Sequence, residues 1–165
     1  MSWVRVPRAR TPRQAGLAGT EEGKRLHMKQ QTLTILKPDT IARRNAGAIA
    51  ARLEQEGFEI LAVRKLHLTE DQAKAFYAVH QERPFYRPLV EFMTSGPVWV
   101  LALERDNAVE HLRKVMGATD SAKAEKGTIR AQFGTNIERN AIHGSDSPEN
   151  ARIELAFFFA ASELL

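Results

Sequence analysis

Polar and apolar positions follow two different periods along the first part of the chain. Residues 32–36 alternate and stop at Lys37-Pro38, which predicts a strand that ends where proline removes a backbone donor. Residues 46–55 carry apolar side chains at helical spacing before Gly57, which predicts a helix with a glycine after its last turn. Residues 58–68 return to a period of two and predict a long strand. Its predicted buried face consists of Ile60, Ala62, Leu66 and Leu68.

The middle of the chain predicts helices on both sides of a central strand. Residues 69–72 form a capping box that would open a helix to about His80, and residues 89–93 suit a further short helix. Residues 98–103 are continuously apolar between turn signals, which predicts a central strand covered on both faces. Asn107 is then expected to cap a helix that runs to about Met116.

The last part of the chain predicts a loop, a short strand and a helix. Residues 117–127 lack periodicity and suit a surface loop, and a short strand is expected near residues 140–143. Ser147-Pro148-Glu149 then combines an N-cap residue, a proline and an acid in the order in which helices begin. The whole order favours a compact α+β sandwich with a ferredoxin-like, split-βαβ topology.

Composition narrows the classes of protein that this chain could belong to. The 165 residues suit one domain and contain no apolar run long enough to cross a bilayer, so we expect no membrane partner. The sequence has no cysteine, which excludes a disulfide framework, a thiolate nucleophile and a cysteine-based zinc site. A cytoplasmic location is the default expectation.

The formal net charge of +4 comes entirely from residues 1–27, which hold six Lys or Arg and two Asp or Glu. A basic surface for nucleic acid is therefore not indicated for residues 28–165, which we expect to form the domain. Residues 1–27 lack periodicity, and we expect them to be disordered. An organellar transit peptide is one interpretation, although the serine content and amphipathic spacing are missing. Our preferred hypothesis is that translation begins at Met28.

The segment 140–147 carries the most informative chemistry, because His143 lies beside a glycine, two hydroxyls and a carboxylate. An imidazole at neutral pH can act as a nucleophile or as a general base. The alternative is a histidine that only caps a turn. Glu154 lies on the otherwise apolar stripe of the last predicted helix, so it needs a partner and could orient His143. Alternatively, Glu154 reaches solvent or pairs with Arg152 or Arg130.

Other side chains suit a phosphorylated ligand. Basic residues follow element boundaries, and the arginine fork matches phosphate oxygens, although each one alone is more often a surface charge. These residues are Lys37, Arg113, Lys114 and Arg130. Phe85 and Tyr86 lie in predicted irregular chain, where exposed aromatic rings either stack on a base or pack against their flanking prolines. Walker loops, GxGxxG turns and HExxH helices are absent, and the other histidines show no metal-ligand spacing.

Six segments in register carry a resemblance to a known family. They are Leu36–Asp39, Glu82–Phe85, Thr94–Pro97, Met116–Thr119, Gly127–Arg130 and Asn140–Ser147. Over about residues 32–164 the chain resembles the nucleoside diphosphate kinases. The resemblance implies a ferredoxin-like fold and transfer of the γ-phosphate of ATP to a nucleoside diphosphate through a phosphohistidine. It also implies Mg²⁺ as cofactor, held mainly by the nucleotide phosphates and not directly by the protein.

The resemblance also implies roles for individual residues. His143 would be the nucleophile, oriented by Glu154 and Ser145. The residues implied to contact the nucleotide are Lys37 and Asn140 at the ribose and transferring phosphate, Arg113, Thr119 and Arg130 at the phosphates, Phe85 at the base, and Tyr77 as a support of the site. Sparse contacts to base edges would give low base selectivity, which fits a role in balancing nucleoside triphosphate pools.

Some features of the chain depart from the family pattern. Thr119 is followed by Asp120-Ser121 where the family usually has Asn-Pro in a loop of subunit contacts. The short stretch after Phe159 favours a homotetramer over a hexamer. Two other functions compete with the enzyme: a nucleic-acid-binding module that uses the basic N-terminal arm, and a structural subunit with a degenerate site. We expect ATP and nucleoside diphosphates as partners, and no specific nucleic acid.

Overall fold

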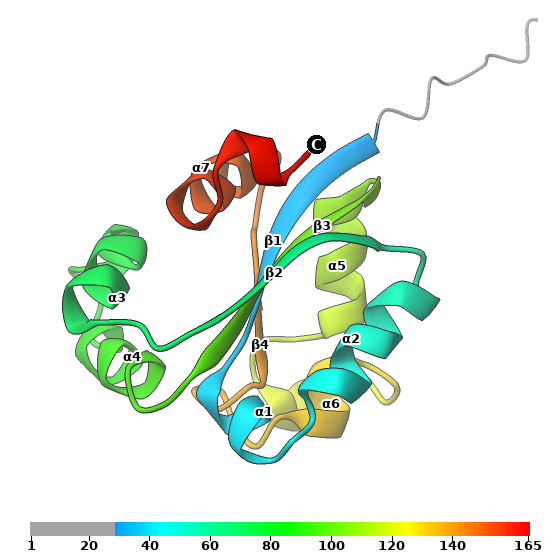
Figure 1. The fold of residues 1–165 in the computed structure, drawn as a ribbon. Coiled ribbons are helices and arrows are strands. Elements are labelled where there is room, and N and C mark those ends of the chain that lie inside the picture. Colours follow the sequence, from blue (N-terminus) through cyan, green and yellow to red (C-terminus); the bar gives the residue numbers. More distant parts are fainter. Residues whose placement is uncertain (1–28) are drawn as a thin grey trace, which may run out of the picture.

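The computed structural model describes residues 29–165, and these build one antiparallel sheet in the order β2-β3-β1-β4 (Figure 1). The strands are β1 (Lys29–Leu36), β2 (Glu59–Leu66), β3 (Val98–Asp106) and β4 (Ile142–Gly144). With β1 and β3 in the centre and β2 and β4 at the edges, this is the ferredoxin-like arrangement that the sequence predicts. The expectations for residues 1–27 lie outside the described residues.

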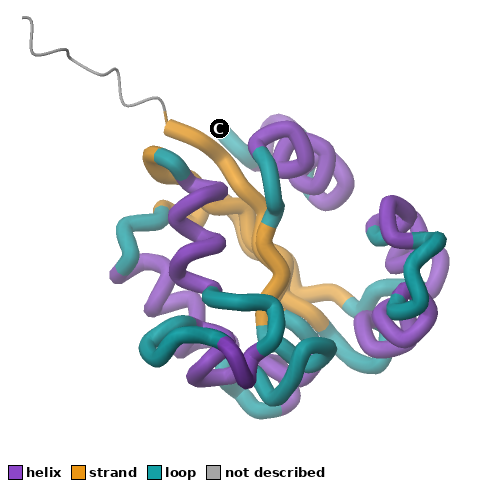
Figure 2. Tube along the Cα trace, turned by 180° about the vertical axis from the view of Figure 1, so that it is seen from behind, coloured by secondary structure: helices purple, strands orange, loops and turns teal. Residues whose placement is uncertain are grey.

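Helices cover both faces of the sheet, as Figure 2 shows from behind. The α-helices are α1 (Pro38–Ala42), α2 (Ala46–Gln55), α3 (Glu70–Phe76), α4 (Tyr86–Met93), α5 (Ala108–Met116), α6 (Ile129–Phe133) and α7 (Pro148–Phe158). Short 3₁₀ turns are η1 (Ala78–His80), η2 (Ser121–Lys123) and η3 (Ala161–Glu163). One core lies under α3, α4 and α7, and a second lies under α2, α5 and α6. No helix of residues 29–165 is long and apolar enough to span a bilayer.

β3 divides its side chains between the two cores, which explains its continuously apolar sequence. Val98, Val100 and Ala102 pack in the first core, whereas Leu101 and Leu103 pack in the second. All five side chains are buried. The expectation of a central strand covered on both faces is confirmed.

Three local predictions need correction. β2 contains a bulge between Ile60 and Ala62, and Ile60 therefore packs with the second core while Ala62 packs with the first. The predicted single buried face of residues 58–68 is wrong for that reason. The helix opened by the capping box ends at Phe76, and Tyr86 begins α4 instead of lying in irregular chain.

Two predicted helix starts behave differently in the structure. Ser147 is confirmed as the N-cap of α7, because its hydroxyl accepts a bond from the backbone N–H of Asn150. Asn107 does precede α5, but its side chain makes no capping bond. It adopts a left-handed conformation with φ of 53°, so it turns the chain into the helix through its backbone. The loop of residues 117–127 is confirmed except that it contains η2.

Candidate active site

His143 lies at the centre of β4, an edge strand of three residues. It faces Ile35 of β1 across an antiparallel pair, and Ile35 belongs to the core under α3, α4 and α7. The backbone carbonyl of His143 accepts a bond of 2.6 Å from the Thr34 hydroxyl. These contacts fix the backbone of His143, and its imidazole is 21% exposed, so part of the ring is accessible to a ligand.

One ring nitrogen of His143 is held by a carboxylate. Glu154 of α7 places Oε2 at 3.0 Å from His143 Nε2, and the Ser145 hydroxyl donates to the same oxygen at 2.7 Å. Ser145 is itself buried and bonded to the backbone of Leu33. Glu154 therefore takes His143 and Ser145 as partners and not Arg152 or Arg130. This geometry favours a proton on Nε2 and leaves Nδ1 as the nitrogen with a free lone pair.

Two aromatic rings of α3 and its C-cap stand edge-on to His143. The ring centroids of Phe76 and Tyr77 lie 5.4 and 6.1 Å from that of the imidazole. The Tyr77 hydroxyl is buried, and no residue among 29–165 hydrogen-bonds it. Burial and, after it, the charge of Glu154 raise the pKa of Tyr77. The phenol is therefore a neutral donor without a protein partner.

Lys37, which follows β1 and precedes α1, is a buried ammonium bound to an amide. Its Nζ donates to Asn140 Oδ1 at 2.6 Å. The Asn140 amide nitrogen donates to the carbonyls of Thr119 and Ile137, which fixes the orientation of its oxygen towards Lys37. Burial and, after it, the positive charge of Arg130 lower the pKa of Lys37 to about 8.

Arg130 in α6 is a second buried cation. Its guanidinium donates to the carbonyls of Gly117 and Ile142 at 3.0 and 2.9 Å. Its Nε is buried, and no residue of the described chain accepts a bond from it. Burial and then the nearby charge of Arg113 lower the pKa of Arg130 to about 10. Arg113 itself is exposed in the last turn of α5.

The backbone between Asn140 and His143 is unusual. Ala141 has φ of 70°, a left-handed conformation that costs a side chain with Cβ about 1 kcal/mol or more. Its carbonyl accepts bonds from the Lys37 N–H at 2.9 Å and from the Thr40 hydroxyl at 2.8 Å. This turn therefore ties the end of β1 to the strand that carries His143.

The remaining predicted residues lie at the periphery. Phe85, the N-cap of α4, is 51% exposed and packs against the ring of His80 at 5.4 Å between centroids. The Thr119 side chain is exposed, and only its carbonyl is bonded within the predicted set, to Asn140. The structure thus brings His143, Glu154 and Ser145 together, and it brings Lys37, Asn140 and Arg130 together. It leaves the side chains of Phe85, Arg113 and Thr119 open.

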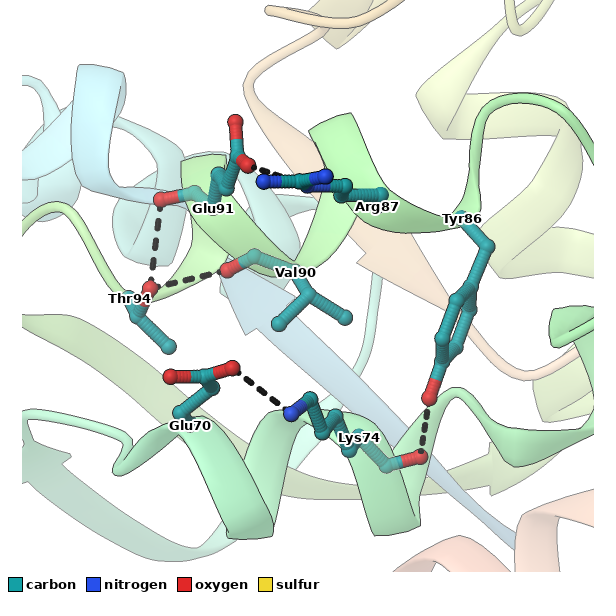
Figure 3. Close-up of a pocket in the computed structure, with 7 residues that line it drawn as sticks. All are labelled: Glu70, Lys74, Tyr86, Arg87, Val90, Glu91 and Thr94. Atoms are coloured by element: carbon teal, nitrogen blue, oxygen red, sulfur yellow. Dashed lines mark hydrogen bonds and ion pairs between the residues drawn. The ribbon is translucent and has the colours of Figure 1, made fainter.

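A pocket of about 510 Å³ lies between α3 and α4 (Figure 3). Its charged side chains pair within each helix, Glu70 with Lys74 at 2.6 Å and Arg87 with Glu91 at 3.0 Å. The Tyr86 hydroxyl donates to the Lys74 carbonyl across the two helices. With its charges already paired, this pocket offers no free cation to a phosphate. The Tyr86–Lys74 bond joins α3, whose C-cap is Tyr77, to α4, which begins after Phe85.

Comparison with known proteins identifies the family. The model of the family described as "Nucleoside diphosphate kinase" matches residues 30–164. This chain belongs to the nucleoside diphosphate kinase family. A nucleoside diphosphate kinase of Helicobacter pylori is 55% identical over 137 residues, which are 83% of this chain and all of the relative. One from Nitrosomonas eutropha is 53% identical over 135 residues, 82% of this chain and 96% of the relative.

Solved structures of nucleoside diphosphate kinases share the fold. The Aquifex aeolicus enzyme superposes with a TM-score of 0.81 at 46% identity, over 83% of this chain and 99% of its own. A halophilic enzyme from Halobacterium salinarum in complex with CDP superposes with a TM-score of 0.80 at 37% identity, over 83% of this chain and 91% of its own. The predicted fold and the predicted activity, a nucleotide phosphotransferase, are confirmed.

Kinases of this family act on nucleotides, generally with a divalent metal. Residues 29–165 of this member hold no group of three or more His, Asp or Glu side chains that could bind a metal ion. In proteins Mg²⁺ usually binds through one or two carboxylates together with substrate phosphates.

Sequence reasoning did not single out two buried residues close to Lys37. Phe92 of α4 is buried, with the Lys37 ammonium 5.9 Å and the Arg139 guanidinium 5.5 Å from its ring centroid. Asp39 of α1 is buried two residues after Lys37. Phe92 carries no sequence signal beyond an apolar helix position, whereas Asp39 lies within one of the six family segments and could have been singled out.

Proposed function

We propose that this kinase transfers phosphate in two half-reactions through a phosphohistidine on Nδ1 of His143. The observation that carries the proposal is the 3.0 Å contact between Glu154 Oε2 and His143 Nε2. It fixes the ring and leaves Nδ1 unoccupied by any hydrogen bond from the described residues. The CDP complex of the halobacterial relative supports a nucleotide as the ligand.

In the first half-reaction the Nδ1 lone pair attacks the γ-phosphorus of a nucleoside triphosphate. A P–N bond forms, the bond from phosphorus to the β,γ-bridging oxygen breaks, and the nucleoside diphosphate leaves with that electron pair. The imidazole becomes cationic, and the Glu154 carboxylate at Nε2 stabilises that charge. A second nucleoside diphosphate then attacks the phosphorus, the P–N bond breaks, and the neutral ring returns.

Cations and donors of the site would hold the phosphates during both half-reactions. Lys37 and Arg130 are already fixed by neutral carbonyl or amide oxygens and so keep their charges for a ligand. The unpaired Tyr77 hydroxyl supplies a further donor. The exposed Arg113 and Thr119 would close on the phosphates from the solvent side, and Asn140 with Lys37 would reach the ribose. Mg²⁺ bound to the nucleotide would neutralise phosphate charge.

The half-exposed Phe85 ring would stack on the base. Stacking uses the face that every base presents, so it supports low base selectivity. A homotetramer and Mg²⁺ as the metal remain predictions from the resemblance, and a cytoplasmic location remains the default expectation from composition.

The test is exposure of the protein to γ-labelled ATP and Mg²⁺, followed by a chase with an unlabelled nucleoside diphosphate other than ADP. We expect acid-labile label on the protein that passes to the new triphosphate. His143→Ala should take up no label, whereas His67→Ala, which removes a ring that hydrogen-bonds the Thr94 carbonyl, should label normally. Full labelling of His143→Ala would refute the phosphohistidine at this position.

A further inference from the structure

Asp39 is a buried carboxylate without a hydrogen-bond partner. Asp39 is 8% exposed, and both of its carboxylate oxygens are buried and accept no hydrogen bond from any residue among 29–165. No other carboxylate of the described chain has both oxygens in this state. Burying such a group without a hydrogen bond or a paired charge is unfavourable, so its presence requires an explanation.

The explanation lies in the charges that face Lys37. Arg130 from α6 is a like charge that lowers the Lys37 pKa, whereas Asp39 and Glu138 oppose that effect. A fourth charge, Arg139, has its guanidinium 5.5 Å from the centroid of the Phe92 ring, and the Lys37 ammonium lies 5.9 Å from the same centroid. Among residues 29–165, the ammonium makes one hydrogen bond, to the neutral Asn140 amide. Asp39 and Glu138, the acids that oppose the positive charges around Lys37, therefore act on the ammonium without a hydrogen bond to it.

Asp39 and Glu138 differ in how strongly they act. Glu138 is exposed, so water and salt screen its charge. Asp39 is buried on the first turn of α1, and its charge acts through the poorly polarisable interior. Of the two acids, Asp39 has the larger influence on Lys37.

We propose that Asp39 is a positioning residue for phosphoryl transfer: its unpaired carboxylate keeps the Lys37 ammonium charged while leaving the N–H donors of that ammonium free for a phosphate. A direct salt bridge would occupy those donors, whereas a carboxylate at longer range supplies the charge without competing for them. The inference rests on the proposed role of Lys37 as a phosphate ligand.

The test compares the pH dependence of kcat/KM for phosphorylation of His143 in the parent protein and in Asp39→Asn. The parent should lose activity above pH 8, because the pKa of Lys37 is about 8 and the neutral amine cannot hold a phosphate. The amide of Asp39→Asn keeps the shape of the side chain but removes its charge. The basic limb, which is the fall of kcat/KM towards high pH, should therefore move to lower pH in this variant. If the limb moves by about one pH unit, the rate at pH 9 falls about 10-fold below the parent, and the rate at pH 6.5 stays within about twofold.

Matched variants separate this effect from a general loss of charge. Glu138→Gln should move the limb in the same direction but less, and Glu54→Gln on the exposed face of α2 should not move it. Asp39→Glu retains the charge and should keep the limb near the parent's. An Asp39→Asn limb that coincides with the parent's, or a loss of rate that is equal at every pH, would overturn the proposal.

Two further measurements keep the result independent of folding and of the proposed reaction. NMR titration of the Lys37 ammonium, assigned with Lys37→Met, should give a lower pKa in Asp39→Asn than in the parent even if His143 takes no label. If Asp39→Asn does not fold, Lys37→Met/Asp39→Asn should fold, because the buried ammonium that needs the carboxylate is gone. An unfolded double variant would assign Asp39 a structural role unrelated to Lys37.

Discussion

Glu154 Oε2 lies 3.0 Å from His143 Nε2, so a helix and an edge strand meet at one hydrogen bond. Glu154→Gln keeps the size of the side chain but removes the charge that stabilises a cationic ring. We expect phosphorylation of His143 to slow by about 10- to 100-fold in single-turnover measurements. Glu149→Gln, in the exposed first turn of the same helix, is the control and should change the rate little. An unchanged rate in Glu154→Gln would remove the carboxylate from the mechanism.

Ser145 acts on His143 only through Glu154, to which it donates a bond of 2.7 Å. Ser145→Ala should therefore slow phosphorylation less than Glu154→Gln does. Both residues belong to one network, so their effects should not multiply. The phosphorylation rate of the double variant should therefore lie within about twofold of the rate of Glu154→Gln alone. Independent effects that multiply in this double-mutant cycle would show that Ser145 contacts the reacting groups directly.

The sequence predicts this pair because a carboxylate, Glu154, interrupts the apolar stripe of a helix that begins shortly after His143. Glu154 shares that stripe with Ala151, Leu155 and Phe158, all buried in the structure. Their periodicity is local, and the cap at Ser147 places the helix start correctly. The resemblance then supplied the roles that spacing alone left open.

Features that depend on contacts between distant segments could not be predicted. The bulge after Ile60 depends on register with β3, and period-two spacing in a single strand contains no register. Ala141 adopts a left-handed conformation although alanine gives no signal for it, because bonds to its carbonyl from Lys37 and Thr40 hold it there. The sequence also could not show that the Asp39 carboxylate lacks a hydrogen-bond donor among residues 29–165, because that depends on which distant segments pack around it.

The buried ammonium of Lys37 lowers the free energy of unfolding, although we propose that it binds phosphate. The charged ammonium costs roughly 3 kcal/mol, because its pKa is about 8 instead of 10.5. Lys37→Met should lose phosphorylation activity yet raise the free energy of unfolding at pH 7 by about 2 kcal/mol, part of the gain being offset by the unpaired Asn140 amide.

This stability difference should depend on pH. Between pH 8 and 10.5 the unfolded chain of the parent keeps the proton on Lys37 and the folded chain loses it, so parent stability rises with pH and the advantage of Lys37→Met shrinks. Urea unfolding at pH 7 and pH 10 measures both values. Lys114→Met, at an exposed position of α5, should change stability by less than about 0.5 kcal/mol. A destabilised Lys37→Met would contradict this account.

Gly144 ends β4, and a side chain there would meet buried side chains of α5. A Cβ there would lie 2.8 Å from Met116 Sδ and 2.9 Å from Leu112 Cδ2, both in buried side chains of α5. Gly144→Ala should lower the free energy of unfolding by about 1–3 kcal/mol in urea titrations. Gly47→Ala meets nothing within 4 Å in α2 and should stabilise by up to about 1 kcal/mol. Equal effects of the two substitutions would contradict the predicted clash.

We expect Phe85 to raise the affinity for a nucleotide only by stacking on its base. Phe85→Ala should raise the Kd for ADP about 10-fold, the value of one stacking contact, and leave the Kd for tripolyphosphate unchanged. Isothermal titration calorimetry measures both constants. Val79→Ala, which trims another strongly exposed apolar side chain near the end of α3, is the control. Equal weakening of both ligands by Phe85→Ala would indicate a disturbed site instead of lost stacking.

The two carbonyl bonds of Arg130 have a consequence for turnover. Its guanidinium joins the end of α5 to β4 through Gly117 and Ile142 before any nucleotide arrives. A side chain held in this way loses its rotamer entropy once, during folding, and not at each binding of a diphosphate in the proposed cycle. A two-step exchange releases one nucleotide and admits another in every cycle, and a preassembled cation lets both events occur without rebuilding the site.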